Sequence, residues 1–97
     1  MIKVINQNEE SEILSLQRIY DILTDKETFI DSHNPAECNS KKAAERLIAW
    51  LPNIKELGIF RYFDNDFIDV TFKDGDSVRL YNTGYELAFE RLVSHVE

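Results

Sequence analysis

The sequence has little of what builds disulfides, membrane spans or export signals. It contains one cysteine, Cys38, so an internal disulfide cannot form. No apolar run approaches the roughly 18 residues of a membrane helix, and no charged segment leads into an apolar one as in a signal peptide. We therefore expect a protein of the reducing cytoplasm without a membrane role.

Glycine and histidine are also scarce, which limits catalytic chemistry. The three glycines supply no phosphate-binding loop, and the GxGxxG, GxxxxGK[ST], GxSxG, HExxH and CxxC motifs are absent. His33 and Cys38 are close in sequence but lack a third residue to orient them, and His95 falls in the final helical turn, where it can bind helix carbonyls. We expect no catalytic residue and no cofactor, and a small cysteine–histidine enzyme is the least favoured hypothesis.

Acidic residues and aromatic rings, in contrast, are plentiful. The 97 residues include 18 Asp and Glu against 11 Lys and Arg, which gives a net charge of −7, and 11% are aromatic. A chain of this length predicts one domain, 1–97, that needs its aromatic rings to build a core. The negative charge disfavours direct binding of nucleic acid and favours a basic partner.

Hydrophobic spacing predicts an α+β fold in the order β-α-α-β-β-β-α, in which a three- to four-stranded antiparallel meander packs with about three helices. The expected elements are a strand at 2–5, a helix at 9–23 capped by Asn8, a loop at 24–39 with a helical turn at 28–31, a helix from 39 or 40 to 51 stopped by Pro52, strands at 58–63, 67–73 and 77–81, and a helix after the capping box at 83–86.

The register of the meander depends on its two turns. Three-residue loops at 64–66 and 74–76 would pair Phe63 with Phe67 and Lys73 with Ser77. One face, expected to form the core, then carries Phe60, Tyr62, Ile68, Val70, Phe72, Val78 and Leu80. The opposite face carries Ile59, Arg61, Phe63, Phe67, Asp69, Thr71, Lys73, Arg79 and Tyr81. Its apolar members are either covered by another element or belong to a binding surface.

Charge is segregated along the chain. Residues 1–37 carry −5, residues 38–63 carry +3 and residues 64–97 carry −5. The meander places aspartates at both ends of the sheet, about 20 Å apart, and such a row covers roughly three phosphate steps of DNA. The same acids in turns could simply maintain solubility. They resemble parts of calcium loops but lack the glycine and closing glutamate, so no metal site is expected.

From Met1-Ile2-Lys3-Val4-Ile5, through Asp64-Asn65-Asp66, to Phe89-Glu90-Arg91-Leu92, the chain resembles the small acidic anti-CRISPR proteins of phages, and among them the type I-F inhibitors that mimic double-stranded DNA. The resemblance rests on size, layout and charge. It implies a non-enzymatic inhibitor that binds the basic DNA-binding site of a CRISPR RNA-guided surveillance complex in the host bacterial cytoplasm and blocks target DNA.

The expected partner contacts follow from the positions of the acids. We expect a monomer that binds the effector complex through acids of the meander and, as a second surface, acids near the amino terminus. These residues are Asp64, Asp66, Asp69, Asp74 and Asp76, followed by Glu9, Glu10, Glu12, Asp21 and Asp25. The alternative is an immunity protein or antitoxin that caps a basic nuclease toxin with the same kind of surface.

Overall fold

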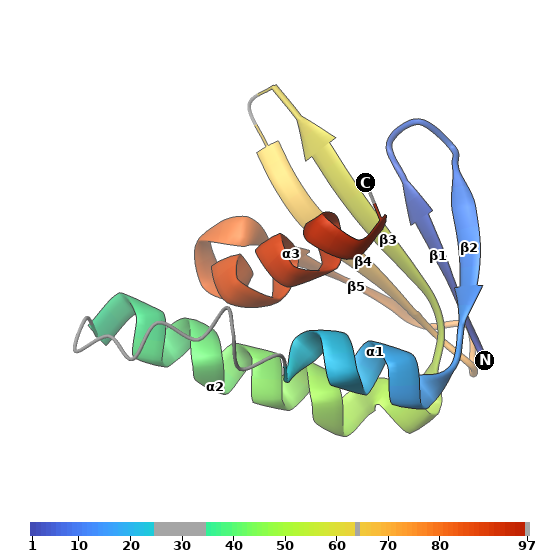
Figure 1. The fold of residues 1–97 in the computed structure, drawn as a ribbon, viewed down its shortest axis with the longest axis horizontal. Coiled ribbons are helices and arrows are strands. Elements are labelled where there is room, and N and C mark those ends of the chain that lie inside the picture. The colour runs from blue at the N-terminus through green and yellow to red at the C-terminus, as the bar shows by residue number, and fades with distance from the viewer. Residues whose placement is uncertain (25–34, 64, 97) are drawn as a thin grey trace.

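A computed structural model describes residues 1–24, 35–63 and 65–96 (Figure 1). The fold is α+β, and the described residues form a five-stranded sheet and three α-helices. The elements are β1 (Ile2–Asn6), β2 (Ser11–Leu14), α1 (Leu16–Leu23), α2 (Pro35–Trp50), a 3-10 turn (Leu51–Asn53), β3 (Ile54–Tyr62), β4 (Asn65–Phe72), β5 (Ser77–Tyr81) and α3 (Asn82–Val96).

The sheet is larger than predicted and it is mixed. Its strand order is β2-β1-β3-β4-β5, with β1 parallel to β3 and every other neighbouring pair antiparallel. The prediction of a purely antiparallel sheet with three to four strands is therefore wrong. The amino-terminal strand is an interior strand because β2 covers its outer edge and β3 pairs with its inner one.

The predicted helix at 9–23 is wrong in its first half, where the chain forms the β1–β2 hairpin. The Asn6 side chain accepts hydrogen bonds from the backbone N–H groups of Asn8 and Glu10, and Glu9 adopts a φ of 62° in the same turn. These bonds fix a turn where the sequence indicated a helix cap. Helix α1 instead begins after Ser15, whose hydroxyl accepts from the Arg18 N–H.

Two further boundaries differ from the prediction. Helix α2 begins at Pro35. Proline fits the first helical turn because the backbone N–H groups there have no intrahelical acceptor, so the N–H that proline lacks is not missed. The predicted helical turn at 28–31 lies outside the described residues. Helix α3 begins at Asn82 and not after the expected cap, and Tyr85 departs from helical geometry within it.

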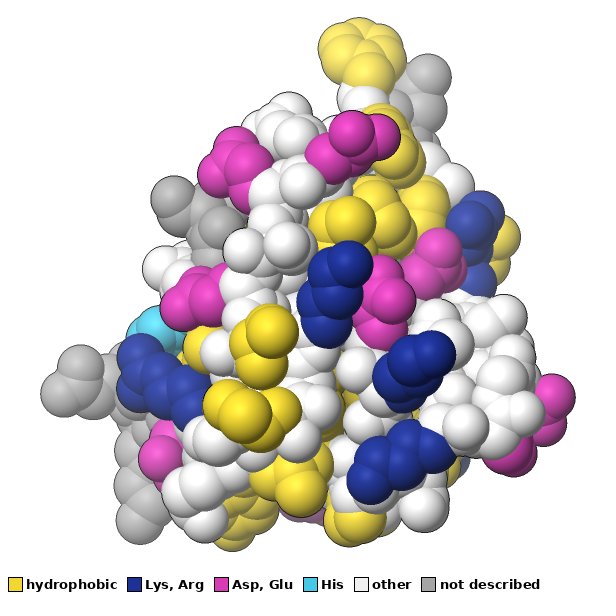
Figure 2. Space-filling view, turned by 90° about the vertical axis from the view of Figure 1, so that its right-hand side faces the viewer, with side chains coloured by type: hydrophobic (Ala, Val, Ile, Leu, Met, Phe, Trp, Pro, Cys, Tyr) yellow, Lys and Arg dark blue, Asp and Glu magenta, His cyan; other side chains and the backbone are white. Residues whose placement is uncertain are grey.

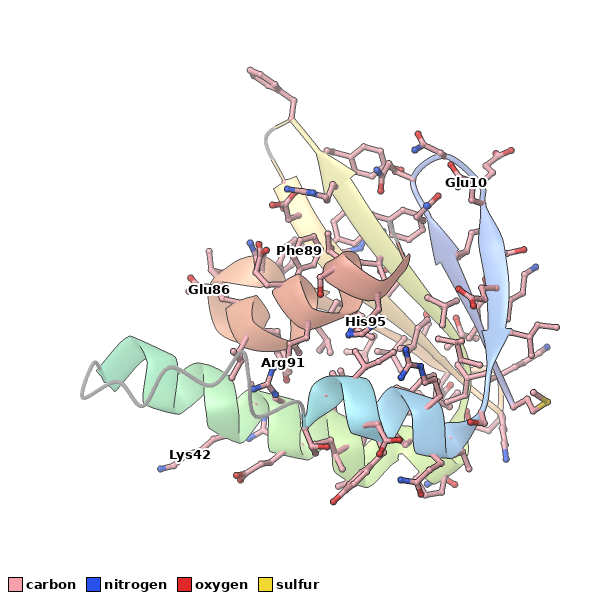
Figure 3. All side chains as sticks on the ribbon, viewed as in Figure 1. Glu10, Lys42, Glu86, Phe89, Arg91 and His95 are labelled. Atoms are coloured by element: carbon pink, nitrogen blue, oxygen red, sulfur yellow. The ribbon has the colours of Figure 1, made fainter. Side chains whose placement is uncertain are left out.

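The core lies between one face of the sheet and all three helices, which cover the same side (Figure 1). The sheet contributes Ile2, Val4, Ile54, Leu57, Ile59, Ile68, Val70 and Leu80, and the helices contribute Ile19, Ile22, Leu23, Ala44, Leu47, Ala88, Phe89, Leu92 and Val93. Arg91 is buried on α3 and donates a hydrogen bond to the Leu23 carbonyl at the end of α1. Figure 3 shows Arg91 extending from α3 toward the other two helices.

The β3–β4 register overturns the predicted assignment of faces. Tyr62 pairs with Asn65, so two residues connect these strands where three were expected. Because side chains alternate along a strand, this odd shift exchanges the two faces of β3. Ile59 therefore lies in the core, whereas Phe60 and Tyr62 face away from the helices. The β4–β5 register shifts by two residues, Thr71 pairing with Ser77, and keeps its faces.

Candidate functional site

The sheet face opposite the helices is the candidate site. Among the described residues, no helix or strand packs over it (Figure 1). Figure 2 looks onto this side of the molecule, where hydrophobic side chains gather toward the end that carries the β3–β4 turn and acidic side chains border them. An uncovered antiparallel face normally carries polar residues, so the aromatic rings on this one need an explanation.

Four rings on this face form a packed cluster, which we call the aromatic platform: Phe60, Tyr62, Phe67 and Tyr81. The Phe67 ring is central, with its centroid 5.2 Å from that of Phe60 and 5.8 Å from that of Tyr62. Phe60 and Tyr62 stack with an interplanar angle of 4°, and Tyr81 meets Phe67 edge-on. Phe67 is only 5% exposed although it faces away from the helices, because its neighbours cover it.

A glycine makes room for this arrangement. Gly58 lies next to Phe60 on the same face of β3, and a Cβ atom built on it would lie 2.8 Å from the Phe60 Cζ. That separation is well inside van der Waals contact, so the ring occupies the space that any side chain at 58 would need. Glycine at position 58 therefore leaves the space that the Phe60 ring fills.

An ion pair extends the platform along β4 and β5. The Arg79 Nε donates to the Asp69 Oδ1 at 2.9 Å, and a second guanidinium nitrogen donates to Oδ2 at 3.3 Å. The Arg79 Cζ also lies 4.0 Å from the centroid of the Phe67 ring. Hydrogen bonding to Asp69 is the main cause that raises the pKa of Arg79 above its ordinary value. The guanidinium is thus held by a ring face and by a carboxylate at once.

Two turns meet at the platform end of the sheet. The Arg61 N–H donates to the Gln7 Oε1, which ties the β1–β2 turn to the end of β3. Glu9 and Glu10 are exposed in that turn, and Figure 3 shows Glu10 at its tip. Phe63 follows β3 with its side chain fully exposed. The platform is therefore bordered by carboxylates and by a protruding ring.

The predicted aspartates of the meander do not form one row. Asp69 lies on the open face, but its carboxylate binds Arg79. Asp66 is half-buried opposite Arg61 and belongs to the other side of the sheet. Asp74 and Asp76 are exposed in the β4–β5 turn, where the Asp74 Oδ1 accepts from the Asp76 N–H.

The predicted second surface is also dispersed. Glu12 lies on β2 opposite Val4. Asp21 lies on α1 and accepts from the Gln17 side chain. Asp25 and Asp64 lie outside the described residues. The structure thus places Glu9 and Glu10 beside the platform and brings none of the other described acids to that border except Asp69.

No catalytic arrangement is visible in the described residues. His33 lies outside them, the Cys38 side chain is not described, and His95 is exposed at the end of α3. The described part of the chain contains no group of three His, Cys, Asp or Glu placed to hold a metal ion. A small cavity lies at the β1–β2 edge, but the side-chain Oδ1 of Asn6 there already accepts hydrogen bonds from two backbone N–H groups.

Comparisons with family models, curated proteins and solved structures give no match to this chain. Among the described helices, none combines the length and the apolar character needed to cross a bilayer.

Sequence reasoning assigned Phe60 and Tyr62 to the core and so missed half of the platform. The sequence contained a signal that would have identified the faces. Along β3, aliphatic and aromatic residues occupy alternate positions: Leu57 and Ile59 pair with the aliphatic core residues of β4, and Phe60 and Tyr62 lie on the opposite face. Segregation of aliphatic from aromatic side chains, more than turn composition, indicates the two faces.

Proposed function

We propose that the chain is a non-enzymatic inhibitor that binds the basic DNA-binding site of a CRISPR RNA-guided complex, of type I-F by resemblance, and blocks duplex DNA by competition. The observation that carries the proposal is the position of the exposed carboxylates. Glu9 and Glu10 project at one end of the sheet, and Asp74 and Asp76 at the other. The eight residues of β4 between these ends span about 25 Å, a length that covers several successive phosphates of a DNA strand.

Binding through these acids has physical consequences that can be measured. Charged contacts between exposed groups accelerate association and weaken as salt is added. Competition with DNA follows because one basic groove cannot hold both the duplex and the protein. Neither a catalytic residue nor a cofactor is needed.

The test is competition for labelled target duplex on a purified type I-F complex. Glu10→Lys combined with Asp76→Lys reverses one charge at each end of the sheet, and we expect it to abolish displacement of the duplex. The matched control is Glu86→Lys combined with Glu90→Lys, which makes the same change in net charge on exposed positions of α3. Equal loss of competition in both variants, or normal DNA binding in the presence of the unaltered protein, would contradict the proposal.

The aromatic platform favours a second candidate, an immunity protein or antitoxin that caps a basic nuclease toxin. Tyrosine is enriched among residues that dominate protein–protein binding energy, and two tyrosines of the platform are half-exposed. Inhibition of a nuclease encoded beside this chain, with no effect on duplex binding by the CRISPR complex, would select this candidate.

A further inference from the structure

We infer that the aromatic platform is a docking site for arginine side chains of a protein partner. The inference deepens the proposed function and rests on it in one respect, that the partner presents a basic surface. It adds the chemistry of recognition: planar guanidinium groups stack on the exposed rings while neighbouring carboxylates bind their N–H groups.

The chain contains its own example of this recognition. Arg79 lies with its Cζ 4.0 Å from the Phe67 centroid while two of its nitrogens bind the two oxygens of Asp69. A ring face and a carboxylate in that relation match a guanidinium, which is planar and presents its donors as a fork. A lysine ammonium satisfies the charge but neither stacks nor binds two oxygens in parallel.

The outer rings remain accessible for a second guanidinium. Tyr62 and Tyr81 are each 51% exposed. Because Tyr62 stacks on Phe60 in nearly parallel planes, one of its faces is occupied within the platform and the other is directed away from Phe60. Cations are attracted to such faces, and arginine more often than lysine.

Charge around the platform favours a cation over an anion. Glu9 and Glu10 are exposed in the turn that adjoins the end of β3, whereas the carboxylate of Asp69 on the open face is already bound by Arg79. Figure 2 shows acidic side chains at the end of the face where the hydrophobic patch lies, and Lys and Arg side chains beside acidic ones over the rest of the face. Single-stranded nucleic acid also stacks on exposed rings, but its phosphates would meet these carboxylates and a chain of net charge −7.

The experiment compares three probes on the full chain: nona-arginine, nona-lysine and a nine-nucleotide oligothymidine. Calorimetry at low salt gives the affinities, and two-dimensional NMR of the 15N-labelled chain gives the location. We expect nona-arginine to bind at least about fivefold more tightly than nona-lysine. We expect its chemical-shift changes on β3, β4 and β5.

A charge-neutral variant isolates the rings. Tyr62→Leu combined with Tyr81→Leu keeps apolar bulk and net charge, and should lower the arginine-to-lysine ratio at least about twofold while changing the nona-lysine affinity less. Tyr20→Leu is the matched control, because Tyr20 is exposed on α1 on the helix side of the sheet and should leave the ratio unaltered. If the double variant fails to fold by NMR, Tyr81→Leu alone replaces it, with a smaller but measurable fall in the ratio.

Four results would overturn the inference: equal affinity for the two peptides, a ratio that survives loss of the tyrosines, shift changes confined to the helices, or oligothymidine binding as tight as that of nona-arginine. Failure of the proposed function is separable. A chain that prefers nona-arginine but does not displace duplex from the CRISPR complex refutes the inhibitor and leaves the docking site. A chain that displaces duplex without preferring arginine refutes only the docking site.

Discussion

Substitution of Gly58 by alanine is the most direct perturbation of the aromatic platform. The new Cβ would lie 2.8 Å from the Phe60 Cζ. The glycine does not have the left-handed backbone that alanine would resist, so the backbone can accept the substitution. Relief must therefore come from the Phe60 side chain, which is half-buried and can swing outward because no described element covers this face.

The magnitude follows from the ring contacts that Phe60 would lose. Its centroid lies 6.0 Å from that of Tyr62 and 5.2 Å from that of Phe67, and each such pair is worth about 0.5–1.5 kcal/mol. Alanine recovers about 0.4–1 kcal/mol by restricting the unfolded chain. The free energy of unfolding should therefore fall by about 1.3 kcal/mol and at most about 2.6 kcal/mol, which for 97 residues lowers the midpoint temperature by about 6 °C and at most about 13 °C.

A double-mutant cycle with Phe60→Ala checks the cause. Urea and thermal unfolding of the four proteins give the free energy of the Gly58→Ala step with and without the ring. Without the ring, alanine at 58 should be neutral or stabilising. An equal destabilisation in both backgrounds would place the cause in the strand backbone and refute the role assigned to Gly58.

Four further outcomes follow from single contacts. Phe67→Ala should lower the free energy of unfolding in urea by about 2–4 kcal/mol, because the ring is buried within the platform. Arg91→Ala should cost about 2–4 kcal/mol in the same assay by opening a cavity and removing the donor to the Leu23 carbonyl, and Arg91→Met should cost less because the stem packing remains. Asp69→Asn should scarcely change the urea midpoint, because the pair with Arg79 is exposed, but should move the Arg79 Nε resonance in NMR spectra. Because the pKa of Arg79 is raised above its ordinary value, the stabilisation from its ion pair with Asp69 is fully present below the ordinary pKa and is lost only as pH rises through the pKa of the folded state. The Arg79 Nε resonance should therefore stay constant between about pH 6 and pH 9.

The elements that local patterns specify were predictable. The three-residue Asp74–Asp76 loop was misplaced by one residue, but the β4–β5 hairpin and its faces were correct, because alternation on both strands tolerates a shift of two residues. The bodies of α2 and α3 were also predicted from their spacing, although their first residues were not. Helix starts depend on a few polar contacts, and several residue types can make them.

Features that depend on distant partners were not predictable. The residues of β2 have spacing that is compatible with a helix, and only pairing with β1 across the Asn6 turn selects the strand. The parallel pairing of β1 with β3 joins segments about 50 residues apart, which no local pattern records. The face on which Phe60 lies depends on whether the β3–β4 loop has two or three residues. Asp and Asn propensity predicted three, and this error assigned Phe60 and Tyr62 to the core.

Net charge and the aromatic platform act over different distances, and this separates their effects on binding. The negative charge attracts a basic partner over roughly a Debye length, about 8–10 Å at physiological salt, before any contact forms. The half-exposed rings act only after contact, where stacking discriminates arginine from lysine. Added salt should therefore slow association with little change in dissociation, whereas loss of Tyr62 and Tyr81 should speed dissociation and leave the association rate nearly unchanged. If ring substitution slowed association as strongly as salt does, the rings would belong to the long-range attraction, and their proposed role in stacking would fail.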